Sequence, residues 1–221
     1  EKIRSAIAFE FDLGMVDPLN IAAIEVVAAP GARVLARCAG LADHLFEHDG
    51  QITKREIRAV TLSSLAPRHG ELLWDIGAGA GSVAIEWLLA GPSMRAVAIE
   101  ARAARSACIR RNAAAFGVPR LDVIEGMAPA ALSGLARPNA IFIGGGGSDS
   151  GILDAAIGAL GLGGRLVVNA VTLETESALL ARHAALGGDL LRITLSRAEA
   201  LGGKTGWRAA MPVTQWTWVK P

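Results

Sequence analysis

The chain of 221 residues is long enough for one full-sized domain with an extension, but short for two complete domains. Its 22 Lys and Arg residues nearly balance its 21 Asp and Glu residues, which argues against a protein that binds nucleic acid through a broadly basic face. Hydrophobic residues make up 52% of the chain, so a sizeable core is expected and widespread disorder is not.

Neither a membrane protein nor a secreted protein is expected. The longest stretches without charged residues, such as Gly126–Ala136, are well short of the roughly 18 residues that a membrane-spanning helix needs. No secretory signal is visible at the start, and two cysteines, Cys38 and Cys108, do not suffice for a disulfide framework. A cytoplasmic, enzyme-like globular protein is the expectation, with Cys108 in its core.

The first 45 residues fit no regular pattern of elements. Asp17 to Asn20 form a turn signal, Ile21–Val27 is a possible strand, and Pro30-Gly31 is a second break. A segment of this size with two breaks cannot build its own core. We therefore expect an extension of the main domain or the end of a larger preceding one.

From Thr53 onward, helical patterns alternate with short apolar runs bounded by Gly or Pro. Thr53 and Glu56 have the spacing of a capping box, so the Thr53 hydroxyl is placed to cap a helix that ends before Pro67. Further helices are expected over Ser82–Ala90, Arg102–Phe116, Gly151–Leu160 and Leu173–Leu186. Seven strands are expected over Glu71–Ile76, Ala96–Glu100, Leu121–Glu125, Ala140–Ile143, Arg165–Ala170, Leu190–Ser196 and Val213–Val219.

This alternation predicts an α/β fold whose mostly parallel sheet carries helices on both faces. The run Val213–Val219 alternates apolar and polar residues, so it should be a half-exposed antiparallel strand at the C-terminus.

A glycine-rich loop follows the first of these strands. Residues 72–86 read LLWDIGAGAGSVAIE, in which Asp75 precedes three closely spaced glycines and a helix. Glycines let the backbone approach a ligand closely, and the amides at a helix start offer hydrogen bonds. Glu100 ends the next strand, where a carboxylate can accept both hydroxyls of an adenosyl ribose.

The spacing of the glycines separates two classes of cofactor. A dinucleotide site requires G-x-G-x-x-G, but the third position of that pattern is Ser82 here. Gly77, Gly79 and Gly81 instead give G-x-G-x-G, the pattern of Rossmann-like class I methyltransferases that bind S-adenosylmethionine. The alternative is a turn that serves packing alone. The combination of strand, loop, helix, second strand and terminal glutamate favours the methyltransferase.

Five blocks, in this order along the chain, carry a resemblance to a known family. They read HDGQITKREIRAVTLSSLAP (48–67), LLWDIGAGAGSVAIEW (72–87), EGMAPAAL (125–132), AIFIGGGG (140–147) and GWRAAMPVTQW (206–216). They resemble the decarboxylating methyltransferase domain that forms the C-terminal half of precorrin-6Y C5,15-methyltransferases in cobalamin biosynthesis. The resemblance implies methyl transfer from S-adenosylmethionine to C15 of a precorrin macrocycle, with loss of carbon dioxide from the ring C acetate side chain.

The resemblance also implies how the chain is organised. The methyltransferase domain would occupy residues 46–221. Residues 18–28, PLNIAAIEVVA, look like the final strand region of a tetrapyrrole methylase domain, so residues 1–45 would be a remnant of that domain or a linker. The missing N-terminal domain would carry the C5 methylation. A homo-oligomer, possibly a tetramer, is implied as well, with the strand that bears Trp216 and Trp218 as a plausible surface.

Cofactor contacts are carried over from the family's motifs. They are Thr53, Gly77, Ala78, Gly79, Ala80, Gly81, Glu100 and Ala128, the last beside the adenine. Thr53 also has the capping role described above, and the two roles are compatible. Asp75 is expected to order the amides of the loop, with a contact to the methionine amine as the alternative.

A substrate with many carboxylates favours basic residues around an open cleft. The candidates are Lys54, Arg55, Arg58, Lys204 and Arg208, and the alternative is that these charges only solvate a helix face or a loop. Gly144 and Gly145 begin a run of glycines that lets a flat ring approach, or else form a flexible turn. Carbon methylation needs alignment more than acid–base help, so no catalytic residue is assigned.

Other functions stay open at this stage. The chain is alternatively a class I methyltransferase for another small molecule or RNA, although the Asn/Asp-Pro-Pro-aromatic motif of amino-methylating enzymes is absent after Ile143. A cofactor-binding or assembly module without chemistry is the non-enzymatic reading. His44-Leu45-Phe46-Glu47-His48 matches the H-x-x-E-H pattern of zinc peptidases, but Asp49-Gly50 follows at once, and no metal site is expected.

Overall fold

The computed structural model describes residues 3–10, 12, 14–32, 34–36, 38–145 and 150–221. The chain divides into two compact units, Glu1–Leu35 and Ala36–Pro221. The first unit contains the 3-10 helix Ala8–Glu10, and almost all of its described side chains are exposed. Ile21–Val27 forms no strand, in contrast to the prediction, because the described part of this unit offers no second strand to pair with.

The second unit is built on a seven-stranded sheet with the order β3-β2-β1-β4-β5-β9-β6. The strands are β1 Leu72–Ile76, β2 Arg95–Glu100, β3 Asp122–Glu125, β4 Ala140–Ile143, β5 Arg165–Ala170, β6 Asp189–Ile193 and β9 Val213–Val219. Strands β1 to β5 pair in parallel, whereas β9 pairs antiparallel with both β5 and β6. The predicted mostly parallel sheet with an antiparallel C-terminal strand is therefore confirmed.

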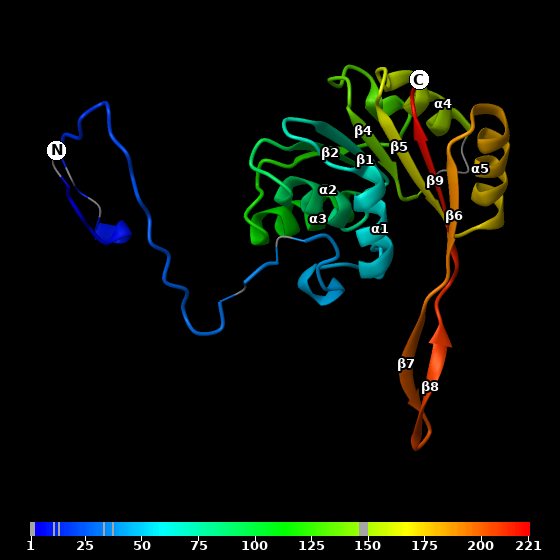
Figure 1. The fold of residues 1–221 in the computed structure, drawn as a ribbon, viewed down its shortest axis with the longest axis horizontal. Coiled ribbons are helices and arrows are strands. Elements are labelled where there is room, and N and C mark those ends of the chain that lie inside the picture. The colour runs from blue at the N-terminus through cyan, green and yellow to red at the C-terminus, as the bar shows by residue number, and fades with distance from the viewer. Residues whose placement is uncertain (1–2, 11, 13, 33, 37, 146–149) are drawn as a thin grey trace. The chain divides into compact units, whose positions relative to one another are not determined.

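Helices cover both faces of this sheet (Figure 1). Helices α1 Arg55–Leu65, α2 Ser82–Leu89 and α3 Ala103–Ala115 pack on one face, and α4 Ser150–Ala159 and α5 Leu173–Leu186 pack on the other. Short 3-10 helices lie at η2 Asp43–Leu45 and η3 Ala130–Leu132. Among the described residues, none of the helices combines the length and the apolar character that crossing a membrane requires.

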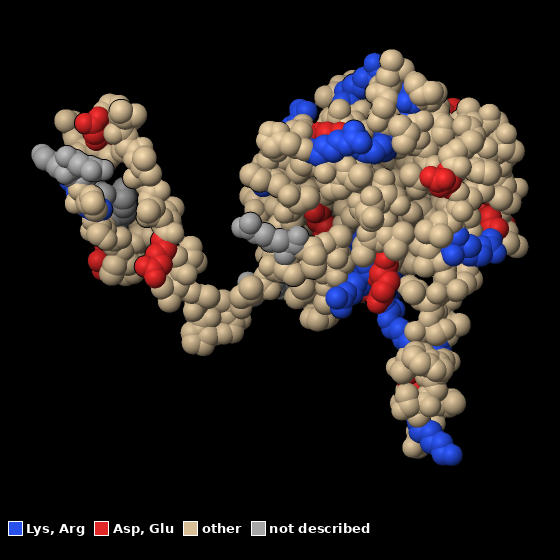
Figure 2. Space-filling model, in the orientation of Figure 1, with Lys and Arg blue, Asp and Glu red and all other residues tan. Residues whose placement is uncertain are grey.

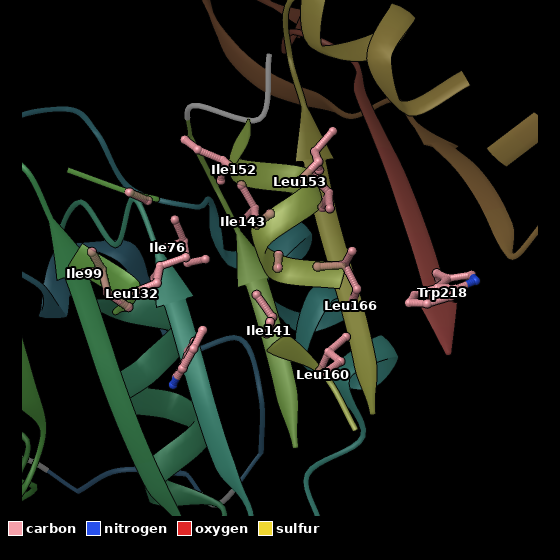
Figure 3. Close-up of a cluster of buried hydrophobic side chains, with 14 of the residues drawn as sticks. Ile76, Ile99, Leu132, Ile141, Ile143, Ile152, Leu153, Leu160, Leu166 and Trp218 are labelled. Atoms are coloured by element: carbon pink, nitrogen blue, oxygen red, sulfur yellow. The ribbon is translucent and has the colours of Figure 1, made fainter. Parts of the chain in front are cut away.

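The core forms because the parallel strands are apolar on both faces. Every residue of β1 and β4 is buried. On the α4 side, one cluster of buried side chains includes Ile76, Ile141, Leu153, Leu160 and the β5 residue Leu166, and Figure 3 shows Ile141 near Leu160 and Leu166. Burying each such side chain contributes about 1.5–3 kcal/mol, so this layer holds the sheet and its helices in a fixed arrangement.

The alternating pattern of the C-terminal strand β9 predicted a half-exposed strand, but β9 is almost entirely buried. It has a partner strand on each side, and Trp216 and Trp218 are 0% and 6% exposed. These two rings lie in the core cluster rather than at the surface. The expectation that they form an oligomer surface is therefore wrong.

The sequence did not predict a separate hairpin of β7 Ser196–Leu201 and β8 Lys204–Ala209. The predicted strand Leu190–Ser196 ends earlier, at Ile193, and the chain then leaves the main sheet. Almost all hairpin side chains are exposed, including Leu201 at 72% and Trp207 at 79%. Because neither face of the hairpin is buried, its sequence lacks the alternation of apolar and polar residues from which strands are predicted.

Candidate cofactor and substrate site

Three backbone segments meet at the carboxyl edge of the sheet, between β1 and β4, where the strand order reverses. In α/β sheets this switch point is where ligands bind. The segments are the glycine loop, Gly77–Gly81; the start of the glycine run, Gly144–Gly145; and residues 40–53, which we call the strap. A Cβ atom added to Gly77 would lie 2.9 Å from the Gly145 carbonyl oxygen, and one added to Gly79 would lie 3.0 Å from the Gln51 carbonyl oxygen.

The glycine loop requires glycine for its conformation as well as for this close packing. Gly77 and Gly79 have φ values of +71° and +59°, in the left-handed region that other residues rarely adopt. The amides of Gly77 and Ala78 donate to the Ile99 carbonyl oxygen at 2.9 and 3.2 Å. The loop is thus fixed to the end of β2.

Glu100 ends β2 beside this loop and is only 5% exposed. Its Oε2 accepts a hydrogen bond from the Gly79 amide at 2.9 Å, and its Oε1 accepts one from the Arg102 amide at 3.0 Å. Each carboxylate oxygen can accept further bonds, so the group is held in place and still able to accept hydroxyl donors.

Asp75 lies on β1 and is buried, with 1% exposure. Its Oδ2 accepts from the Ala84 amide in the first turns of α2 at 3.1 Å, so it orders the helix start rather than the amides of the loop. Its Oδ1 is buried and has no hydrogen-bond partner within the described parts of the chain. Burial, and secondarily the charge of Glu100, raises the pKa of Asp75 to about 7. An unpaired carboxylate oxygen beside a glycine loop fits a cationic ligand.

The sequence led us to expect that Arg58 faces the substrate, but its side chain points into the protein. Its side chain is completely buried: Nε donates to Glu86 Oε1 at 2.6 Å, and Nη1 donates to Asp43 Oδ1 at 3.1 Å. Further bonds run to the carbonyl oxygens of Leu41 and Thr53. Arg58 therefore holds the strap against α1 and α2, and its guanidinium is used inside the protein.

Thr53 does not cap the helix that follows it. Lys54 occupies the N-cap position of α1, and no side chain caps this helix start. The half-buried Thr53 instead contributes its carbonyl oxygen to Arg58. The Thr53 hydroxyl therefore does not have the capping role that the sequence predicted for it.

The strap is also tied to α3, and these ion pairs give the glutamate of the H-x-x-E-H pattern a structural role. Glu47 pairs with Arg111 at 2.5 Å, and Asp49 pairs with Arg105 at 2.8 Å. His44 lies in the three-residue helix η2, so the long helix of a zinc peptidase is not formed. Over the described ranges, no group of three or more His, Cys, Asp or Glu side chains could hold a metal ion.

The remaining basic candidates lie on elements that reach the carboxyl edge. The C-terminal end of α1 lies at the amino edge of the sheet, because the Leu65 carbonyl oxygen accepts from Arg165 at the start of β5. The start of α1, with the exposed Lys54 and Arg55, therefore lies toward the carboxyl edge. The β7–β8 hairpin leaves the sheet beside the end of β5, and basic side chains lie at its far end (Figure 2).

Lys204 and Arg208 on this hairpin are both exposed. Arg208 donates to Glu199 within the hairpin at 2.9 Å. At the base of the hairpin Arg197 pairs with Glu56 of α1, which joins the two basic elements. Arg208 thus lies near the base of the hairpin, opposite Arg197, whereas Lys204 lies at the far end of the hairpin, away from the sheet (Figure 1).

The two glycines after β4 and Ala128 complete the predicted set. Gly144 packs against the ring of Phe142, where an added Cβ would lie 2.9 Å from Cε1, and Gly145 is exposed. Gly146 and Gly147 lie outside the described residues. Ala128 is 8% exposed and packs with Leu132 in the core cluster, so it can offer only its backbone and methyl group to a ligand.

Comparisons with known proteins agree with this geometry. Residues 44–220 match the model of a family described as precorrin methyltransferase domain. A precorrin-6Y C(5,15)-methyltransferase [decarboxylating] from Sinorhizobium sp is 62% identical over 220 residues, which are all of this chain and 53% of that protein. The cobalt-precorrin-6B C(15)-methyltransferase (decarboxylating) of Salmonella typhimurium is 35% identical over 73% of this chain and 85% of its own length.

A solved structure shows the same fold. The crystal structure of the C-terminal domain of precorrin-6Y C5,15-methyltransferase from Rhodobacter capsulatus superposes with a TM-score of 0.80 at 50% identity, over 84% of this chain and all of that one. The chain spans about half the length of the first curated relatives it matches, at 53% and 50%. On the match over residues 44–220 and on these relatives, the chain belongs to the family of precorrin methyltransferase domains.

Proposed function

We propose that this chain binds S-adenosylmethionine and transfers its methyl group to C15 of a precorrin, with loss of carbon dioxide from the ring C acetate side chain. The observation that carries the proposal is the glycine loop Gly77–Gly81, packed between the strap and Gly145 beside the carboxylates of Asp75 and Glu100. The relatives named for the same reactions support it.

The bound cofactor would supply an electrophilic methyl group on a sulfonium. Glu100 would accept the ribose hydroxyls, and the negative charge of Asp75 would favour a cation at the loop. Thr53 and the backbones of Ala78, Ala80 and Ala128 would border the cofactor. These groups bind and orient the reactants, and alignment alone supplies a large part of the rate for such a transfer.

The substrate would lie over the carboxyl edge of the sheet. Lys54, Arg55, Lys204 and Arg208 would pair with its carboxylates, and Gly144 and Gly145 would let the flat macrocycle approach. Arg58 is removed from this set because its guanidinium is buried and engaged.

We also propose that residues 1–45 are the end of a preceding tetrapyrrole methylase domain or a linker from it, since a relative about twice as long aligns with the whole chain. For a homo-oligomer, the exposed apolar side chains of the hairpin, Leu201 and Trp207, now offer the better surface than the buried Trp216 and Trp218.

Mass spectrometry of the reaction product tests the proposed reaction. The chain, incubated with S-adenosylmethionine and the reduced precorrin-6 substrate, should yield a product that has gained one methyl group and lost one carbon dioxide. Titration calorimetry of the chain with S-adenosylmethionine separates this function from the alternatives. No binding at high micromolar concentration contradicts any methyltransferase, whereas binding without turnover of the precorrin contradicts the substrate only.

Replacing Glu100 by Gln should weaken the binding of S-adenosylmethionine by about 1.5–3 kcal/mol, because bonds from hydroxyls to a charged acceptor are lost. Calorimetry measures the change. Glu125→Gln is the matched control, since Glu125 ends the neighbouring strand β3 opposite Glu100 but is exposed. Equal affinities of the two variants would remove Glu100 from the site.

A further inference from the structure

The side chain of Asn112 connects the strap to the glycine loop. It lies on α3 and is 3% exposed. Its Oδ1 accepts from the Glu47 amide at 2.8 Å, and its Nδ2 donates to the Glu47 carbonyl oxygen at 2.9 Å and to the Ala80 carbonyl oxygen at 3.0 Å. One buried amide group thus bonds the backbone of the strap in both directions and the backbone of the loop once.

Only a carboxamide has this combination of partners. Its two N–H donors point to two carbonyl oxygens on different segments, and its oxygen accepts the one amide that faces it. A carboxylate of the same shape has no donors and would face two carbonyl oxygens. An apolar side chain would take the bonds of Asn112 from the Glu47 amide and the Ala80 carbonyl oxygen and would leave the Glu47 carbonyl oxygen with only the Cys108 thiol as donor, at a cost in stability.

The bonded backbone groups belong to the two walls that define the cofactor site. Ala80 stands between Gly79 and Gly81 in the loop, and Glu47 lies four residues before Gln51, whose carbonyl oxygen packs against Gly79. The strap meets the loop directly where Gln51 packs against Gly79, and the bridge through Asn112 joins the two walls at a second place. Loss of the bridge is therefore expected to loosen the strap relative to the loop.

We infer that Asn112 is a positioning residue for the cofactor: it fixes the strap at the distance from the glycine loop at which S-adenosylmethionine is bound. This inference rests on the proposed function. A positioning role differs from a merely structural role in its effect on the enzyme: loss of the bridge should weaken cofactor binding more than it slows the chemistry that follows binding.

The test compares Asn112→Asp, at pH 8, with the unchanged chain. Calorimetry should show a dissociation constant for S-adenosylmethionine raised about tenfold or more, the effect of losing one to two net hydrogen bonds. With the precorrin substrate, KM for S-adenosylmethionine should rise by a similar factor while kcat at saturating cofactor stays within about threefold. Asn112→Ala, which places no charge in the core, should show the same split and serves if the Asp variant does not fold.

Two control variants make the result specific. Cys108→Ala removes a buried thiol one turn away that donates to the Glu47 carbonyl oxygen at 3.1 Å and accepts from Asn112 Nδ2 at 3.7 Å; its hydrogen bonds run to the strap and to Asn112 and not to the glycine loop. Arg165→Met breaks a buried ion pair with Glu71 at the opposite edge of the sheet and should lower thermal stability. Both should keep the dissociation constant within about twofold of the unchanged chain.

An Asn112 variant that loses stability but keeps its cofactor affinity and KM would overturn the inference alone, and so would an equal loss of affinity in Arg165→Met. Failure of the unchanged chain to bind S-adenosylmethionine would overturn the proposed function and the inference with it.

Discussion

Replacing Arg58 by Met is expected to lower the free energy of unfolding by about 3–5 kcal/mol, which is the usual effect of removing one partner from a buried ion pair. The substitution leaves the carboxylate of Glu86, whose side chain is 2% exposed, without its cation. Glu86 still accepts from the amides of Gly40 and Leu41 at 2.6 and 3.0 Å, so its charge stays buried. Chemical denaturation at pH 7, followed by tryptophan fluorescence, measures the loss.

The same substitution at an exposed pair is the control. Arg208, with a side chain 77% exposed, pairs with Glu199, and Arg208→Met should cost less than about 1 kcal/mol. In the double variant Arg58→Met/Glu86→Gln the unpaired charge is gone, so part of the loss should be recovered. A loss below 1 kcal/mol for Arg58→Met would show that Arg58 does not hold the strap.

The helical pattern contained a signal for the buried role of Arg58. Thr61, Leu62 and Leu65 follow it at helical spacing on the face that α1 buries, and Arg58 belongs to the same face. The interpretation as a substrate contact relied instead on its neighbours Lys54 and Arg55, which are exposed. Position on the helix decides between the two roles, and charge alone does not.

The parallel sheet and the glycine loop were predictable because they are local. Each strand is a short apolar run. The loop is recognisable from the spacing of Gly77, Gly79 and Gly81 after Asp75, with Glu100 at the end of the next strand. The strap was not predictable in this way, since its contacts join residues far apart, such as Glu47 with Asn112. The prediction that β9 is half-exposed failed for a related reason: its consecutive polar residues Thr214 and Gln215 are both buried and form hydrogen bonds to other elements.

Asp75 should make the stability of the protein depend on pH in the direction opposite to most carboxylates. Its pKa is raised from 3.8 to about 7 by burial and then by Glu100, so the folded state holds a proton that the unfolded state has released. Stability from this group is thus complete below the unfolded pKa and is lost as pH rises toward 7. At 1.36 kcal/mol per pKa unit the full effect is about 4 kcal/mol, of which about 2–3 kcal/mol falls between pH 5 and 8.

The change is measured as a difference, because other carboxylates titrate in the acid range. The free energy of unfolding of Asp75→Asn minus that of the unchanged chain should rise by about 2–3 kcal/mol from pH 5 to 8 and level off above. Glu100→Gln in both chains should make the rise smaller, since one cause of the shift is removed. A difference that is flat with pH would show that Asp75 is ionised throughout this range.

The same group links pH to the proposed cofactor. A cation at the glycine loop stabilises the ionised form of Asp75 and so lowers its pKa, and by linkage its binding must release a proton. The affinity for S-adenosylmethionine should therefore be higher at pH 8 than at pH 6 in the unchanged chain, and this gain should be smaller in Asp75→Asn. Calorimetry in two buffers of different ionisation enthalpy counts the proton directly. Equal heats in the two buffers, after correction for ligand alone, would mean that the unpaired Oδ1 of Asp75 does not sense the cofactor's charge.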